Sequence, residues 1–212
     1  MTAFPILTYD TPPAPPETGG RRTFRYTLER YHAAIAAGVL TENDPVELIF
    51  GEIIEKLPIG KRHSDCVDLL IDTFAPRYLG THRLRAQNPV TLLGNSEPEP
   101  DFAIVDKETY AQRKGQPLAE DILLLIEVSD ATLEYDRSTK LKMYALAGIQ
   151  EYWIINLRQD QVEVHFDPDT ESGEFNRIHR YRKEETLASP FCGKMQVGDL
   201  LPPADEEGSD KL

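Results

Sequence analysis

The chain has 212 residues and a formal net charge of −13, from 36 acidic and 23 basic side chains. Hydrophobic residues make up 40% of it, enough for a core in one domain of ordinary size, which excludes a wholly disordered chain. Nonspecific nucleic-acid binding requires Lys and Arg that neutralise phosphates, so this acidity also excludes a protein that coats DNA.

Two cysteines, Cys66 and Cys192, are too few and too isolated for a disulfide framework or a zinc site, and we expect reduced thiols. No stretch approaches the ~20 apolar residues of a membrane helix. The first residues lack the basic and apolar regions of a signal peptide. The sequence therefore predicts a cytoplasmic protein with no membrane partner.

Composition divides the chain into three parts. Proline and glycine crowd residues 1–25, which predicts a flexible arm. Residues 203–212 carry a net charge of −3 and predict a disordered acidic tail. Residues 26–202 form the single predicted domain. This part itself carries a charge of −11, so the predicted fold is acidic.

The domain begins with a predicted helix and a hairpin. Thr27 is a typical N-cap, and apolar residues three and four apart continue the helix until Gly38. Two short β-rich runs, residues 46–50 and 52–55, then flank Gly51, which predicts a hairpin with its turn at the glycine.

A second helix follows the hairpin. Apolar residues at helical spacing predict an amphipathic helix over residues 61–75, and Pro76 should end it. His63 lies one turn before Val67 and therefore falls on the inward face of this helix.

The rest of the domain predicts strands and one further helix. Asp136 is a plausible N-cap of a helix that runs to Ala147 and ends at Gly148. The predicted strands cover residues 83–93, 101–105, 122–128, 152–157 and 162–166, followed by a loose β meander over 175–200. This order predicts an α/β fold with a central mixed β-sheet flanked by helices.

Two carboxylates stand against apolar strands. Asp101 precedes a four-residue apolar run, and Glu127 follows a five-residue one. An ionised carboxylate in such a place costs several kcal/mol unless a cation or hydrogen-bond donors compensate it. If the two strands are antiparallel neighbours, these side chains face each other. They would then share a proton or bind a metal ion, and Mg²⁺ prefers such oxygen ligands.

Lys140 lies one turn before Tyr144 on the third predicted helix, beside the face that should pack on the sheet. A lysine there could neutralise the carboxylates or activate a water for attack on phosphorus. The alternative is a surface lysine that extends from the flank of the helix.

These residues carry a family resemblance. The chain resembles the Uma2 family, formerly a domain of unknown function, which is similar to the PD-(D/E)XK nuclease superfamily. The resemblance extends from Thr27 to Leu201. It rests on the stretch 47–53, His63, Pro100-Asp101, Glu127-Val128-Ser129, Asp136-Arg137 with Lys140, and Gly148 followed by Glu151-Tyr152-Trp153.

The resemblance implies a restriction-endonuclease-like core and Mg²⁺-dependent hydrolysis of DNA phosphodiester bonds, with Mn²⁺ as a substitute. Asp101 and Glu127 would be the metal ligands, joined by the backbone carbonyl of Val128. Ser129 stands where the superfamily pattern has a lysine. Lys140 is then the best candidate for a lysine supplied from the helix, with Lys142 as the second candidate.

His63 and Glu52 complete the candidate catalytic residues. His63 would contact the reacting water or the phosphate, and its alternative is a hydrogen-bonded core histidine. Alternation along the hairpin allows Glu52 to reach the site or to face solvent. Asp136 is interpreted as a helix cap, and Tyr144, Tyr152 and Trp153 as core aromatics.

The predicted function is a metal-dependent endonuclease with DNA as its partner. Short basic runs, at Lys61-Arg62, Arg83 with Arg85, and residues 179–183, could contact the DNA backbone. Two symmetric cuts would require a homodimer. One alternative function is a catalytically inactive, nuclease-like module that acts by binding or regulation, and a second is hydrolysis of some other phosphate ester.

Overall fold

The computed structural model describes residues 23–41 and 43–203. Most of the predicted arm and almost all of the predicted acidic tail therefore lie outside the described residues. Among the residues described, no helix is both long enough and apolar enough to cross a membrane.

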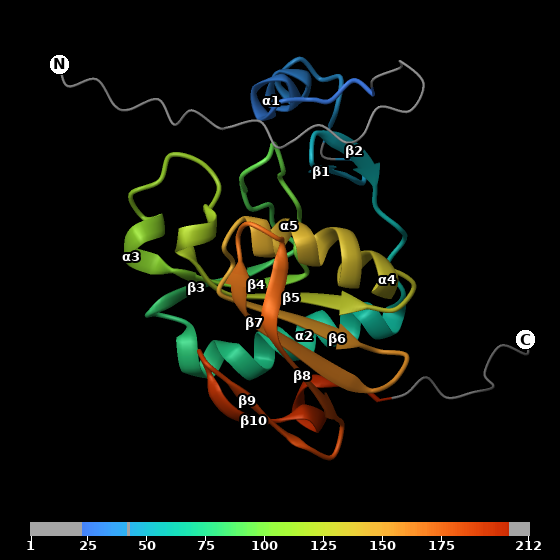
Figure 1. Cartoon of the computed structure of the whole chain (residues 1–212), viewed down its shortest axis with the longest axis vertical. Coiled ribbons are helices and arrows are strands. Elements are labelled where there is room, and N and C mark those ends of the chain that lie inside the picture. The colour runs from blue at the N-terminus through green and yellow to red at the C-terminus, as the bar shows by residue number, and fades with distance from the viewer. Residues whose placement is uncertain (1–22, 42, 204–212) are drawn as a thin grey trace, which may run out of the picture.

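A six-stranded sheet forms the centre of the molecule (Figure 1), and its strands follow one another in chain order. Neighbouring strands are antiparallel, except that β5 and β6 are parallel. The predicted α/β fold with a mixed sheet is confirmed. The strands are β3 (His82–Ala86), β4 (Phe102–Asp106), β5 (Ile122–Ser129), β6 (Glu151–Asn156), β7 (Gln161–Asp169) and β8 (Glu174–Arg182).

Helices cover both faces of this sheet. In Figure 1, α2 (Lys61–Tyr78) lies below the sheet and a continuous helical run lies above it. The run consists of α4 (Leu133–Tyr135), a π-helical turn (Asp136–Lys140) and α5 (Leu141–Leu146). Because β5 and β6 are parallel, the chain must cross over between them, and this helical run is the crossover.

Smaller elements surround these layers. At the top of Figure 1, α1 (Leu28–Ala36) lies beside the hairpin of β1 (Val46–Ile49) and β2 (Glu52–Glu55). At the bottom, β9 (Thr186–Ser189) pairs with β10 (Gly193–Gln196). The short helix α3 (Lys107–Tyr110) follows β4, and 3₁₀ turns cover Ala119–Asp121 and Val197–Leu200.

Side chains that alternate along the strands build two cores. Toward α2, the cluster contains Leu70, Phe74, Phe102, Ile126 and Trp153. Toward the helical run, a second cluster contains Ala103, Leu125, Met143, Tyr144 and Tyr152. The central strands are apolar on both faces because both faces are covered, so a charged side chain there must find a polar partner.

Several predicted boundaries are confirmed. The Thr27 side chain caps α1 by accepting a hydrogen bond from the Arg30 N–H. Gly51 turns the β1–β2 hairpin at φ +78°, a value that favours glycine. The two cysteines are free and buried.

Three predicted boundaries are wrong. Helix α2 continues through Pro76 to Tyr78, because a proline in the last turn removes only one backbone donor. The strand expected over 83–93 ends at Ala86, since Gln87 has φ +51°. Asp136 lies inside the helical run, which begins three residues earlier at Leu133. Its carboxylate accepts hydrogen bonds from the hydroxyls of Ser129 and Thr132 and does not cap the helix.

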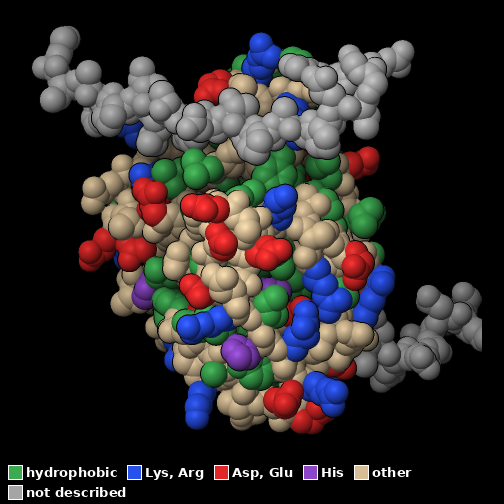
Figure 2. Space-filling view, in the orientation of Figure 1, with side chains coloured by type: hydrophobic (Ala, Val, Ile, Leu, Met, Phe, Trp, Pro, Cys, Tyr) green, Lys and Arg blue, Asp and Glu red, His purple; other side chains and the backbone are tan. Residues whose placement is uncertain are grey.

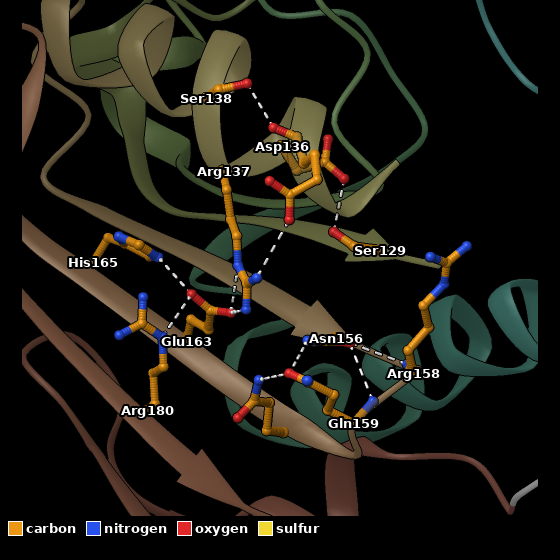
Figure 3. Close-up of polar contacts among 12 residues, drawn as sticks. Ser129, Asp136, Arg137, Ser138, Asn156, Arg158, Gln159, Glu163, His165 and Arg180 are labelled. Atoms are coloured by element: carbon orange, nitrogen blue, oxygen red, sulfur yellow. Dashed lines mark hydrogen bonds and ion pairs between the residues drawn. The ribbon is translucent and has the colours of Figure 1, made fainter. Parts of the chain in front are cut away.

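A buried carboxylate ties the helical run to the far side of the sheet (Figure 3). Glu163 of β7 has no exposed surface, and its Oε1 accepts two hydrogen bonds from Arg137 of the π turn. Its Oε2 accepts a hydrogen bond from Arg180 of β8 at 3.2 Å and lies 3.6 Å from His165 Nε2. Although burial opposes ionisation, His165, Arg137 and Arg180 lower the pKa of Glu163 to about 2.

Replacing Glu163→Gln should destabilise the fold by about 3 kcal/mol at neutral pH, because both arginines lose their buried counter-charge. The lowered pKa of Glu163 contributes stability that is fully present above about pH 4.5 and is lost as the pH falls toward 2. The difference between wild type and variant in urea unfolding should therefore shrink over that range. Glu174→Gln, at an exposed position of β8, is the matched control.

Candidate active site

Asp101 and Glu127 lie at adjoining ends of two neighbouring strands. Asp101 directly precedes β4, and the antiparallel register pairs Phe102 with Ile126 of β5. The next step outward along the ladder brings Asp101 beside Glu127. The Val128 N–H donates a hydrogen bond to Asp101 Oδ2 at 2.8 Å, so this carboxylate continues the ladder where β4 stops. The predicted antiparallel pairing is confirmed.

Lys140 reaches this edge of the sheet from the π turn. Its Nζ donates a hydrogen bond to Glu127 Oε1 at 3.0 Å and lies 3.5 Å from Oε1 of Glu47 on β1. One turn further on, the Tyr144 hydroxyl donates to the same Glu127 oxygen at 2.6 Å. Lys140 is buried, whereas Lys142 is exposed. Of the two candidate lysines, the structure brings Lys140 into the site.

His63 approaches Asp101 from α2, on the other face of the sheet. The distance between His63 Nε2 and Asp101 Oδ2 is 3.0 Å. Burial favours the neutral ring, but the hydrogen bond and charge of Asp101 outweigh it and raise the pKa of His63. In turn, His63 lowers the pKa of Asp101 in spite of that carboxyl group's burial. The two side chains therefore favour an ion pair.

Asp136 is a further buried carboxylate at this site. The hydroxyls of Ser129 and Thr132 each donate a hydrogen bond to Asp136 Oδ2 at 2.7 Å. Burial, supported by the charge of Asp101, raises the pKa of Asp136, while Lys140 opposes this rise. Ser129 thus serves as a hydrogen-bond donor to Asp136.

The charges of the cluster do not balance. Burial is the largest cause that raises the pKa of Glu127, and Asp101, Asp136 and Glu47 raise it further against the opposing charge of Lys140. Burial favours the neutral amine of Lys140, but the charges of Glu127, Glu47, Asp136 and Asp101 outweigh it and raise the pKa of Lys140. Lys140 therefore remains an ammonium, and the surplus of carboxylates calls for a proton or an additional cation.

The oxygen atoms present fit a hard divalent cation. Asp101 Oδ1 and Glu127 Oε2 accept no hydrogen bond from any described residue. The Ser129 carbonyl bonds to Leu157 on the β6 side. By strand alternation, the Val128 carbonyl faces the Asp101 side.

No set of three or more His, Cys, Asp or Glu side chains in the described part of the chain forms a ready metal cage. Mg²⁺ binds through one or two carboxylates and keeps several waters, so two carboxylates and a carbonyl suit it.

Two polar atoms near the cluster lack a partner among the described residues. His63 Nδ1 and the Tyr135 hydroxyl are buried and make no hydrogen bond. Burial and the charges of Glu47, Asp136 and Glu127 raise the pKa of Tyr135 to about 12, so its hydroxyl is a neutral donor. Buried polar groups are normally satisfied, which indicates that water or a ligand belongs at this site.

Glu47 takes the place that the sequence analysis gave to Glu52. Glu52 is partly exposed and its carboxylate forms an ion pair with Arg25 at 2.8 Å, so the structure does not bring it to the cluster. Glu47 is buried, and its Oε2 accepts a hydrogen bond from the Glu99 N–H. The signal was present in the sequence: Glu47 stands inside an apolar strand run, as Glu127 does.

This arrangement of a mixed sheet, flanking helices and buried carboxylates defines a nuclease-like fold. A solved structure with the same fold is described as "a putative nuclease belonging to DUF820" from Anabaena variabilis ATCC 29413. Its TM-score is 0.59 at 19% sequence identity, covering 82% of this chain and 96% of that one.

Sequence comparison identifies the family. The Uma2 family, described as "Putative restriction endonuclease", matches residues 28–192, and the chain belongs to this family. A search of curated proteins gave no match. The resemblance found in the sequence is confirmed.

Lys140→Met should cost about 3 kcal/mol or more of unfolding free energy at neutral pH, because it leaves buried carboxylates without their cation. Adding Glu127→Gln to this variant should recover part of the loss, since one of the unpaired charges is then removed. Urea unfolding of the two single variants and the double variant measures this coupling. Additive effects of the two substitutions would contradict a direct contact between these side chains.

Proposed function

We propose that the chain is a metal-dependent endonuclease that hydrolyses phosphodiester bonds in DNA. The observation that carries this proposal is the contact between Lys140 Nζ and Glu127 Oε1 at 3.0 Å, next to Asp101 at the edge of the sheet. In this proposal, the lysine from the crossover helix acts in place of the lysine that the superfamily pattern has on the strand. Membership of a family described as "Putative restriction endonuclease" supports the same reaction.

Asp101 and Glu127, with the Val128 carbonyl, would hold Mg²⁺, and Mn²⁺ could replace it. Such an ion supplies a bound water of lowered pKa and positive charge against the phosphate. A bound cation would offset part of the protein's negative charge at the point where the phosphate approaches.

The residues of the chain divide the remaining work. The water oxygen would attack phosphorus while the water gives up a proton to solvent, the bond from phosphorus to the leaving oxygen would break, and that oxygen would take up a proton from solvent. The Lys140 ammonium stabilises the negative charge that develops on the phosphoryl oxygens. His63, hydrogen-bonded to Asp101 at 3.0 Å, fixes the orientation of this carboxylate. Tyr144 holds Glu127 in the same way.

Asp101→Asn and Glu127→Gln should each lower the cleavage rate of DNA with Mg²⁺ by about a hundredfold or more, because each removes a ligand charge. EDTA should abolish cleavage by the wild type, and added Mg²⁺ or Mn²⁺ should restore it. Conversion of supercoiled plasmid to nicked and linear forms measures the rate. Calorimetric titration with Mn²⁺ should show weaker binding to both variants.

Glu52→Gln is the matched control, since it changes an acidic residue of the hairpin that the structure leaves outside the cluster. This variant should cleave and bind Mn²⁺ as the wild type does. Metal-loaded wild-type protein that binds DNA but cuts no DNA form would instead favour the inactive, nuclease-like binding module. Equal rates for wild type and Asp101→Asn would exclude the proposed ligand set.

A further inference from the structure

Two guanidinium groups meet on the face of the sheet that carries Glu127, because one buried carboxylate binds both. Glu163 is fully buried, whereas the side chains of Arg137 and Arg180 are 28% and 55% exposed. Their contacts with Glu163 are visible in Figure 3. The carboxylate thus fixes the inner edges of both guanidinium groups and leaves their outer edges open to solvent.

The outer edges retain unused donors. A guanidinium group has five N–H donors. Arg180 uses only Nε, toward Glu163, and its two Nη groups make no hydrogen bond with any described residue. Arg137 uses Nε and Nη2, and its Nη1 lies 3.6 Å from the largely exposed Glu134. Because Glu163 fixes these side chains in advance, less entropy is lost when an anion binds them.

The strand register places this pair in line with Glu127. Glu127 lies opposite Ile154, which lies opposite Glu163, which lies opposite Arg180. Three strand spacings make Arg180 about 14 Å distant from Glu127 across the sheet. Ile154 and Glu163 are buried, so a DNA strand would pass along the edge of the sheet, where a rise of 3.4 Å per nucleotide makes this spacing about four nucleotides.

Arg182 lies closer than Arg180 to the edge of the sheet that bears the candidate site, because its register leads through Gln161 and Asn156 to Ser129. It is exposed, lies two residues beyond Arg180 on the same face of β8, and pairs with Gln161 at the start of β7. A shallow cavity of about 450 Å³ is lined by Arg182 and Gln161, together with Lys183, Asp160 and Glu184. We call Arg137, Arg180 and Arg182 the arginine row.

We propose that the arginine row binds backbone phosphates of the DNA strand several nucleotides away from the bond that is cut. This inference rests on the proposed function and names where its substrate lies. Guanidinium groups match phosphate oxygens in geometry and bind them through paired hydrogen bonds. On the face drawn in Figure 2, acidic and basic side chains are interspersed. Binding therefore depends on such local groups and not on a uniform positive field.

The test measures DNA binding separately from cleavage. Fluorescence anisotropy of a fluorescein-labelled DNA duplex, with Ca²⁺ in place of Mg²⁺, is recorded over a range of salt concentrations. Arg180→Gln and Arg182→Gln should each raise the Kd about three- to tenfold and lower the salt slope by about 1, as expected when one phosphate contact is lost. Glu134→Gln should lower the Kd, because it frees Nη1 of Arg137.

Arg177→Gln is the matched control, since Arg177 is an exposed arginine of the same strand that lies three residues from Arg180 and therefore on the opposite face of β8. This variant should bind DNA as the wild type does. A purely structural role of Arg180 would lower the melting temperature and leave the salt slope unchanged, and that result would overturn the inference.

The outcomes also separate this inference from the proposed function. Wild-type protein that cuts DNA, with unchanged binding by both arginine variants, would overturn the arginine row alone. Wild-type protein that binds without cutting, with weaker binding by both variants, would support the row and refute hydrolysis. Wild-type protein that neither binds nor cuts DNA would overturn both.

Discussion

Lys140 carries a positive charge into a cluster of buried carboxylates, and separate parts of the chain meet around it. Glu127 comes from the central sheet, Glu47 from the β1–β2 hairpin, and the ammonium itself from the crossover helix. The hairpin lies outside the central sheet, so the proximity of Glu47 to Lys140 is one of the contacts that hold it there. The packing of β5, the β1–β2 hairpin and the crossover helix against one another therefore depends on the charge of Lys140.

The π turn determines which side chains the crossover helix directs inward. The Leu141 N–H bonds to the Asp136 carbonyl, five residues back, so this turn is wider than an α-helical one. Asp136 and Lys140 are both buried within this turn. Arg137 lies between them in the sequence, and its side chain donates hydrogen bonds to Glu163 on β7. π turns occur often at functional sites, where an extra residue per turn changes the direction of the side chains.

Local signals in the sequence predicted most of the fold, because caps, glycines and apolar runs act over a few residues. Docking between distant segments was not predictable in the same way. The apolar run around Glu47 indicates that this carboxylate is buried, but that it reaches Lys140 depends on how the hairpin packs, which alternation within short strands does not reveal. Asp136 has the residue type of a cap, but the hydroxyls of Ser129 and Thr132 recruit it, and one of them belongs to a different element.

The parallel pair of β5 and β6 has a consequence for how the protein folds. Its strands are joined through the whole crossover, and the site combines residues from 47 to 140. Such pairings form only after a long loop has closed, so the site has high contact order. Until the crossover helix has docked, the carboxylates have no Lys140 beside them. Completion of the site is thereby linked to completion of the fold, and a partly folded chain would lack a functional centre.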